Sequence, residues 1–352
     1  MSFYDISKLD FICPVTRLPL SFCESCDVSL GGKDVNTGYL VSENGEIVYP
    51  VVDQVPQLIR ICSLRGIPDS LKSERWIKDI ITEVEIYDRI FCERMKADLQ
   101  VLISKFSNLD SYSSTFPFPL EVWIDSSTSA DTQFKAYEHL RPLGNKIFLQ
   151  FGGSGTHAVK ALIAGAKEAY LLSPSQMEIK FGQMLAEELG LSDRFIGVRG
   201  IGEEIPLPSG SVDRVYGGGC LHHTDVGKSI PEVYRILKEG GKASFVDPRS
   251  NWLYEFIMKM TRGRRFLGVE DETLDSPIDL VKVCNVVPKG SDLQVYTSGG
   301  PLRYLMIALN RLLKRNLWSS RYTTTILKFE GCFLSKVGLS PLHNNMAILM
   351  KK

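Results

Sequence analysis

The chain contains 352 residues, enough for more than one hydrophobic core, so two domains are the natural expectation. Lysine and arginine together number 41, as do aspartate and glutamate, and the formal net charge at pH 7 is zero. Because enzymes that act on nucleic acids normally carry a basic face, this balance disfavours DNA and RNA as substrates.

Hydropathy and cysteine usage indicate the compartment. No apolar stretch reaches transmembrane length, and the opening residues lack the charged and apolar parts of a signal peptide. The eight cysteines are scattered along the chain, which is typical of reduced thiols in the cytosol. We therefore expect a soluble, cytoplasmic protein without a membrane partner.

Residues 1–62 form the first expected unit. They contain short β-type runs separated by turn residues such as Glu43-Asn44-Gly45, which predicts a small antiparallel β-rich domain. Cys13-Pro14 near its start, and Tyr49-Pro50 and Val55-Pro56 near its end, resemble a zinc-ribbon-like domain. That domain is found alone in activator subunits of some translation-related methyltransferases and fused in front of other methyltransferases.

The metal ligands of that domain are mostly missing here. A tetrahedral zinc site usually takes two Cys-x-x-Cys pairs, and only Cys13 of that set remains. The other positions hold Thr16, Ser42 and Gly45. We therefore expect no metal, and thiols that are buried or partly buried in a module that folds without one. The alternative is a rearranged site in which Cys13, Cys23 and Cys26 are joined by a fourth ligand.

Residues 63–140 are expected to form a helical connector. Between residues 72 and 105, apolar side chains recur at three- and four-residue steps with charges between them, which predicts one long or two successive amphipathic helices. We interpret the apolar stripe as a packing face; alternatively, part of it covers a substrate pocket as a lid. The Ser/Thr-rich span 104–132 is expected to be an irregular connection.

Residues 141–352 alternate short apolar strands with segments of helical periodicity. The expected strands are 147–151, 169–172, 195–198, 212–216 and 243–246, with a last strand in the closing HNNMAILMKK. This alternation predicts a parallel sheet with helices on both faces. Ligands of such sheets bind at the carboxyl ends of the strands, so we expect a site at the ends of the first strands.

Four motifs follow one another in this region: the loop Gly152-Gly153-Ser154-Gly155-Thr156, the turn 203–208, the strand 211–215 and Leu221-His222-His223. In this order they resemble the class I S-adenosylmethionine-dependent methyltransferases, specifically the branch that includes the quinone-biosynthesis C-methyltransferases. The resemblance implies an α/β fold with a doubly wound, mostly parallel, seven-stranded sheet whose last strand inserts antiparallel. It also implies S-adenosylmethionine as the cofactor.

Three positions at which this family usually carries an acidic side chain are neutral here. Gln150 ends the first strand, Ser173 ends the second, where an acid normally binds both ribose hydroxyls, and Ile201 follows the third, near the adenine amine. A carboxylate accepts hydrogen bonds of about 1.5–3 kcal/mol each, against about 0.5–1.5 kcal/mol for a neutral pair. The departures therefore indicate either altered cofactor contacts or a pocket adapted to another ligand.

By the resemblance, the cofactor site lies in the glycine loop and at the ends of the neighbouring strands. Its expected residues are Gln150, Gly152, Gly153, Ser154, Gly155, Thr156, His157, Ser173, Ile201, Gly202, Glu203 and Gly218. His222 and His223 follow the fourth strand and are the candidate catalytic residues, because one of them can act as a general base. The alternative is that both contact the helix start and form the crevice wall.

Two functional hypotheses remain. The first is methyl transfer from S-adenosylmethionine to a small-molecule metabolite, which the intact loop and turn motifs favour. The second is a methyltransferase fold with a lost or repurposed cofactor site, serving as a hydrolase, cyclase or decarboxylase or as a binding subunit. The three neutral positions favour this second reading. The acceptor and the oligomeric state stay open.

Overall fold

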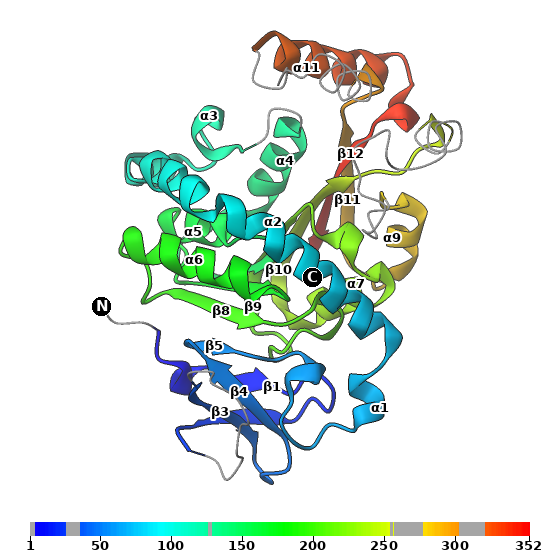
Figure 1. Ribbon diagram of the computed structural model, residues 1–352. Helices are drawn as coiled ribbons and strands as arrows, with labels where there is room; N and C mark the ends of the chain where they lie inside the picture. Colours follow the sequence, from blue (N-terminus) through cyan, green and yellow to red (C-terminus); the bar gives the residue numbers. More distant parts are fainter. Residues whose placement is uncertain (1–3, 26–35, 126–128, 254–255, 257–276, 303–320) are drawn as a thin grey trace. The chain divides into compact units, whose positions relative to one another are not determined.

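The computed structural model describes residues 4–25, 36–125, 129–253, 256, 277–302 and 321–352 (Figure 1). The chain forms two compact units, each treated separately below. Unit 1 comprises residues 1–114, 142–216 and 232–241, and unit 2 comprises residues 115–141, 217–231 and 242–352. The sequence-based boundaries 1–62, 63–140 and 141–352 remain a prediction.

Unit 1 begins with a five-stranded antiparallel sheet in the order β1-β2-β3-β4-β5. Its strands are β1 (Phe11–Ile12), β2 (Pro19–Cys23), β3 (Asn36–Ser42), β4 (Val48–Val52) and β5 (Val55–Pro56). Gly45 has φ 68° in the turn between β3 and β4, a conformation that glycine adopts without steric cost. The expected β-rich module is therefore confirmed.

The thiols of this module lie in different surroundings. Cys13 is fully buried, its sulfur accepts from the Thr16 N–H at 3.5 Å, and it lies 3.7 Å from the Tyr49 hydroxyl. Cys23 is exposed, and Cys26 lies outside the described residues. The described part of the chain contains no cluster of three or more potential metal ligands. The rearranged three-cysteine site remains a hypothesis.

Helices follow this module in unit 1. After the short α1 (Asp69–Lys72) comes α2 (Arg75–Phe106), a single helix of 32 residues, which confirms the expected amphipathic helix. Figure 1 shows α2 running beside α6 (Gln176–Glu188). The Phe91 and Phe181 rings meet there edge to face, with centroids 5.1 Å apart. The apolar stripe of α2 is thus a packing face.

Unit 1 also holds the parallel part of a seven-stranded sheet. Its elements are β6 (Ile147–Phe151), α5 (Thr156–Ile163), β7 (Glu168–Ser173), α6, β8 (Phe195–Arg199) and β9 (Val212–Gly218). β6 pairs in parallel with both β7 and β9, and β7 pairs in parallel with β8. The carboxyl ends of β6, β7 and β8 therefore lie next to one another. The four strands of this part agree with the predicted ones within two residues.

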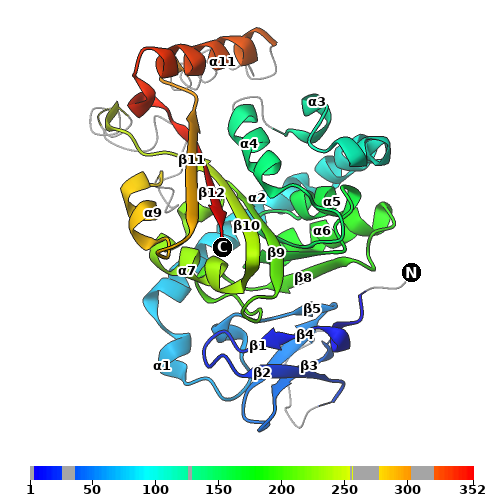
Figure 2. The same cartoon turned by 180° about the vertical axis from the view of Figure 1, so that it is seen from behind.

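Unit 2 holds the antiparallel part of that sheet. β10 (Leu237–Pro248) begins in unit 1 and continues into unit 2, which also contains β11 (Asp292–Ser298) and β12 (Asn345–Lys351). β12 is antiparallel to both neighbours, as Figure 2 shows. The remaining helices are α3 (Leu120–Trp123), α4 (Ala130–Leu140), α7 (Val226–Ile236), α9 (Leu280–Val286) and α11 (Arg321–Lys336). The strand order β11-β12-β10-β9-β6-β7-β8 confirms the mixed seven-stranded sheet, including the antiparallel last strand.

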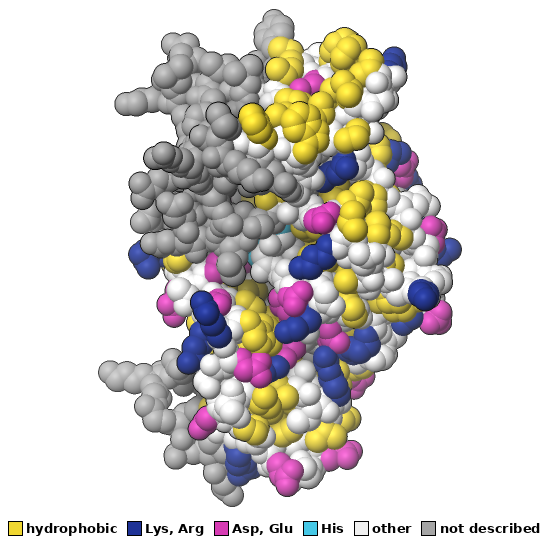
Figure 3. Space-filling view, turned by 90° about the vertical axis from the view of Figure 1, so that its right-hand side faces the viewer, with side chains coloured by type: hydrophobic (Ala, Val, Ile, Leu, Met, Phe, Trp, Pro, Cys, Tyr) yellow, Lys and Arg dark blue, Asp and Glu magenta, His cyan; other side chains and the backbone are white. Residues whose placement is uncertain are grey.

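None of the described helices is long and apolar enough to cross a bilayer. α11 nevertheless exposes an apolar face, which is visible at the top of the space-filling view in Figure 3. Phe329 and Phe333 are 72% and 52% exposed, and their rings lie parallel with centroids 6.4 Å apart. Such a face is unusual on a surface helix, where polar side chains normally predominate.

Candidate active site

The glycine loop after β6 is held in place by Gln150, whose side chain is almost fully buried. Its amide nitrogen donates to the Gly152 carbonyl at 2.8 Å, and its amide oxygen accepts from the Ala158 N–H at 2.8 Å. Ala158 is the third residue of α5, whose N–H has no partner within the helix. A neutral amide therefore orders this loop, by donating and accepting at once.

The loop itself presents backbone donors. Gly152, Gly153 and Gly155 all have positive φ, and a Cβ on Gly155 would lie 2.8 Å from the Gly182 Cα. Among the described residues, no acceptor pairs with the backbone N–H groups of residues 153–156. Such N–H groups, at the start of a helix, favour a carboxylate or another anion. The loop thus fits the carboxylate end of an amino-acid-bearing cofactor.

Two expected cofactor residues near this loop have protein contacts of their own. The Ser154 and Thr156 hydroxyls lie 3.4 Å apart, so each is a near neighbour of the other. The His157 ring lies against Tyr216 of β9, with centroids 4.5 Å apart. The cofactor contacts of these residues stay predictions.

Ser173 at the end of β7 is fully buried and has two partners. Its hydroxyl donates to the Glu178 carboxylate at 2.6 Å and accepts from the Ser175 N–H at 3.1 Å. The Ser175 hydroxyl caps α6 by accepting from the Glu178 N–H at 3.0 Å, and it donates to Asp88 of α2. Burial is the main cause that raises the Asp88 pKa. The neutral Ser173 is thus flanked by carboxylates that come from two helices.

The segment after β8 provides an apolar wall. Ile201 is 2% exposed and packs with Ile59 and Ile77. The Phe151 ring lies directly on Gly202, because a Cβ on that glycine would be 2.1 Å from the ring. Apolar side chains suit the flat face of an adenine, whereas the acidic partner for its amine is replaced by Ile201.

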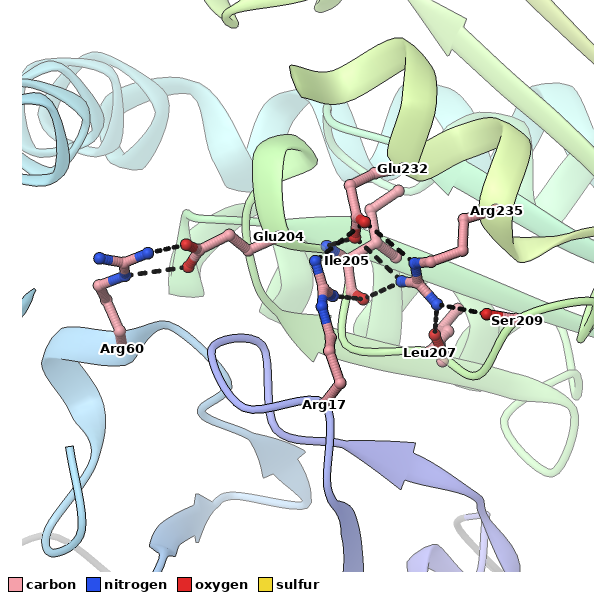
Figure 4. A network of polar contacts seen from close by, with 8 residues as sticks. All are labelled: Arg17, Arg60, Glu204, Ile205, Leu207, Ser209, Glu232 and Arg235. Atoms are coloured by element: carbon pink, nitrogen blue, oxygen red, sulfur yellow. Dashed lines mark hydrogen bonds and ion pairs between the residues drawn. The ribbon is translucent and has the colours of Figure 1, made fainter. Parts of the chain in front are cut away.

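Charged side chains hold the segment that follows this wall, from Glu204 to Ser209 (Figure 4). Glu204 ends the short helix of residues Gly202–Glu204 and receives two hydrogen bonds from Arg60. Glu232 accepts from the Ile205 N–H at 3.0 Å and pairs with Arg17 at 2.9 Å. Arg235 donates to the carbonyls of residues 205 and 207, both at 2.8 Å. Arg17 and Arg60 belong to the first 62 residues, so that module helps to position the wall.

In unit 2, the catalytic candidates lie after β9. The His222 Nδ1 is 2.7 Å from an Asp247 carboxylate oxygen, and the His222 N–H donates to the same oxygen at 3.2 Å. Asp247 is 2% exposed, and its other oxygen is buried without a partner in the described residues. The His222 and His223 ring centroids are 4.1 Å apart. Asp247 therefore orients His222, and the pair matches a general base with its supporting acid.

The predicted site residues fall into two groups. Unit 1 brings together the loop, Ser173 and residues 201–203 at the ends of three adjacent strands. Unit 2 brings Gly218, which accepts from the Cys220 thiol at 3.3 Å, into the same unit as both histidines. Asp247 and Glu178 were not identified from the sequence. Asp247 had a usable signal, because it lies at the carboxyl end of the fifth strand.

The comparisons with known proteins identify a methyltransferase domain within the chain. Residues 149–245 match the family model described as methyltransferase domain. The uncharacterized methyltransferase Rv3342 of Mycobacterium tuberculosis is 39% identical over 64 residues, 17% of this chain and 26% of the relative. The uncharacterized methyltransferase YcgJ of Bacillus subtilis is 28% identical over 131 residues, 36% of this chain and 51% of the relative. The chain thus spans about half or less of the curated relatives it matches.

Solved structures of similar fold are more distant. Geranyl diphosphate C-methyltransferase from Streptomyces coelicolor A3(2) is 16% identical, with a TM-score of 0.43, over 63% of this chain and 78% of that chain. Phosphoethanolamine N-methyltransferase 2 of Haemonchus contortus is 15% identical, with a TM-score of 0.43, over 63% and 52%. The strand order agrees with the doubly wound sheet that the sequence predicts, and residues 149–245 match a methyltransferase domain.

Proposed function

We propose that this protein transfers a methyl group from S-adenosylmethionine to a small-molecule acceptor. The observation that carries the proposal is the glycine loop within the methyltransferase-domain match: Gln150 orders it, and its N–H groups lack acceptors among the described residues. A loop of this kind holds the carboxylate of an amino-acid-bearing ligand. The apolar wall of Phe151 and Ile201 suits the adenine at the other end.

The chain's own residues have three tasks in such a reaction. S-adenosylmethionine, when bound, supplies a methyl group on a positively charged sulfur. The loop and the adenine wall hold the donor still, which matters because most of the acceleration of a displacement comes from proximity and orientation. Water must be kept away from the reacting atoms. An acceptor that carries a proton also needs a base to receive it.

We assign the role of that base to His222. The assignment takes Nδ1, 2.7 Å from the buried Asp247 carboxylate, as the donor of that hydrogen bond, and in this tautomer the lone pair of the ring is on Nε2. The carboxylate also stabilises the imidazolium that forms when Nε2 takes the acceptor proton. His223 lies beside this pair and is assigned to the wall of the acceptor site.

The acceptor is proposed to be polar. In unit 2, β10 and β11 end, and β12 begins, at the same edge of the sheet. Buried polar atoms without a partner in the described residues gather there: Asp247 Oδ2, Arg249 Nε, Asn344 Oδ1 and Glu330 Oε2. The backbone N–H of Arg249 donates to the backbone carbonyl of Asn344 at 2.9 Å, and the side-chain amide of Asn344 donates to the Gly300 carbonyl at 2.8 Å. Buried polar atoms normally have partners, so a ligand with hydrogen-bonding groups fits this edge.

The test is binding followed by turnover. Isothermal titration calorimetry with S-adenosylmethionine and S-adenosylhomocysteine should show one site per chain. Incubation with methyl-labelled S-adenosylmethionine and pools of small polar metabolites should then transfer label to a product of low molecular mass. Binding without any labelled product would support an enzyme of another class on the same fold. No binding of either compound would refute the proposal.

A further inference from the structure

Glu178 occupies an unusual position at the start of α6. Ser175 caps the helix and Glu178 is its third residue, the spacing at which a glutamate usually reaches back to the N–H of the cap residue. Here the Ser173 hydroxyl accepts a hydrogen bond from the Ser175 N–H, at 3.1 Å. The Glu178 Oε2 accepts from the Ser173 hydroxyl at 2.6 Å.

This arrangement puts a carboxylate one hydrogen bond away from the side chain that ends β7. Ser173 is fully buried, whereas Glu178 is only partly buried. A carboxylate has about four lone-pair sites, so the bond from Ser173 leaves capacity for further donors. A pair of neighbouring hydroxyls is such a donor set, because both can donate to one carboxylate.

Two further charged side chains, Arg199 and Asp88, have hydrogen bonds to the same segment. The Arg199 Nε donates to the Pro174 carbonyl at 3.0 Å, so a cation lies beside this segment. Asp88 is the other carboxylate of the cluster, and it is tied to the Ser175 hydroxyl. Glu178, which contacts Ser173 directly, is therefore the better placed of the two for a ligand at the end of β7.

We propose that Glu178 supplies the carboxylate that binds the ribose hydroxyls of S-adenosylmethionine, and that Ser173 orients it. In this chain the carboxylate lies in the first turn of α6 and not at the end of β7. This inference rests on the proposed function, because it needs the cofactor to bind at the carboxyl ends of β6, β7 and β8.

The test measures binding and does not need the acceptor. S-adenosylhomocysteine and its 2′,3′-dideoxyribosyl analogue are titrated into the full chain and into Glu178→Gln. Glu178→Gln should bind S-adenosylhomocysteine roughly tenfold or more weakly, as expected for a lost charge-assisted hydrogen bond. The two proteins should bind the dideoxy analogue equally. Glu188→Gln, at the exposed end of the same helix, removes the same charge and should bind as the parent does.

A second variant tests whether a carboxylate at the end of β7 restores the binding. Ser173→Asp combined with Glu178→Gln moves the carboxylate back to the strand end and should recover most of the affinity that Glu178→Gln loses. Equal affinity of the parent and Glu178→Gln for S-adenosylhomocysteine would overturn the inference while leaving the proposed function intact. A parent that binds no S-adenosylhomocysteine would overturn both. If Glu178→Gln fails to fold, equal binding of both ligands by the parent overturns the inference.

Discussion

Arg60→Ala should be strongly destabilising, because it leaves a buried carboxylate without its partner. Arg60 and Glu204 are 7% and 8% exposed. The Arg60 Nε donates to one Glu204 oxygen at 3.1 Å, and its Nη2 pairs with the other. Removing one partner of a buried ion pair costs about 3–5 kcal/mol. We expect a loss of that size in the free energy of unfolding.

A double substitution separates the pair from the loss of packing. Arg60→Met with Glu204→Gln replaces the charges by groups of similar volume, and such replacements are often close to neutral. The double variant should therefore be more stable than Arg60→Ala by about 2 kcal/mol. Urea unfolding followed by far-ultraviolet circular dichroism measures both. Glu204 ends the Gly202–Glu204 turn, so Arg60→Ala should also weaken S-adenosylhomocysteine binding.

An exposed ion pair provides the control. Lys8 and Asp5 are 2.9 Å apart, with side chains 74% and 49% exposed, so Lys8→Ala should leave the unfolding midpoint unchanged. The reasoning is refuted if Arg60→Ala costs less than about 1 kcal/mol, the range of a surface pair. It is also refuted if the double variant is less stable than Arg60→Ala.

Three further changes test other parts of the account. Gln150→Leu removes two hydrogen bonds and should lower the free energy of unfolding by about 1–3 kcal/mol for each buried group left unpaired. Gln150→Glu keeps the acceptor for the Ala158 N–H and should lower it less, and thermal denaturation of the two variants measures the difference. His222→Asn should lower kcat by about 10²–10⁴-fold for an acceptor that loses a proton, and His223→Asn should lower it less. Equal effects of the two substitutions would contradict the role of His222 as the base. Burial lowers the pKa of His343 in the folded protein, so the unfolded chain binds more protons, and the free energy of unfolding should fall as the pH drops through about 6.5. His343→Gln should reduce this pH dependence, which denaturation measured from pH 5 to 8 would show.

The strands could be predicted from the sequence because each is a short apolar run bounded by glycine or polar residues. The run 147–151 is followed by a loop whose glycines have positive φ, so β6 ends where the pattern changes. The last strand was also predictable, since its apolar run ends with two lysines. Its antiparallel position between β10 and β11 came from the family resemblance.

The site was harder to predict because its contacts join residues whose spacing carries no signal. Gln150 seemed a lost acid, yet its amide bonds to Ala158 eight residues later, which depends on how the loop turns back. Ser173 seemed a lost ribose contact, and only the geometry of the helix start shows Glu178 beside it. His222 and Asp247 lie 25 residues apart and meet at a hydrogen bond within unit 2.

A crystal structure of the chain with S-adenosylhomocysteine would show where the cofactor binds. We expect the amino-acid end of the ligand on the backbone N–H groups of residues 153–156 and the ribose hydroxyls within hydrogen-bond distance of Glu178. The adenine should lie against Phe151 and Ile201. A nucleoside bound elsewhere, or crystals soaked at saturating concentration without any ligand in this crevice, would contradict the account.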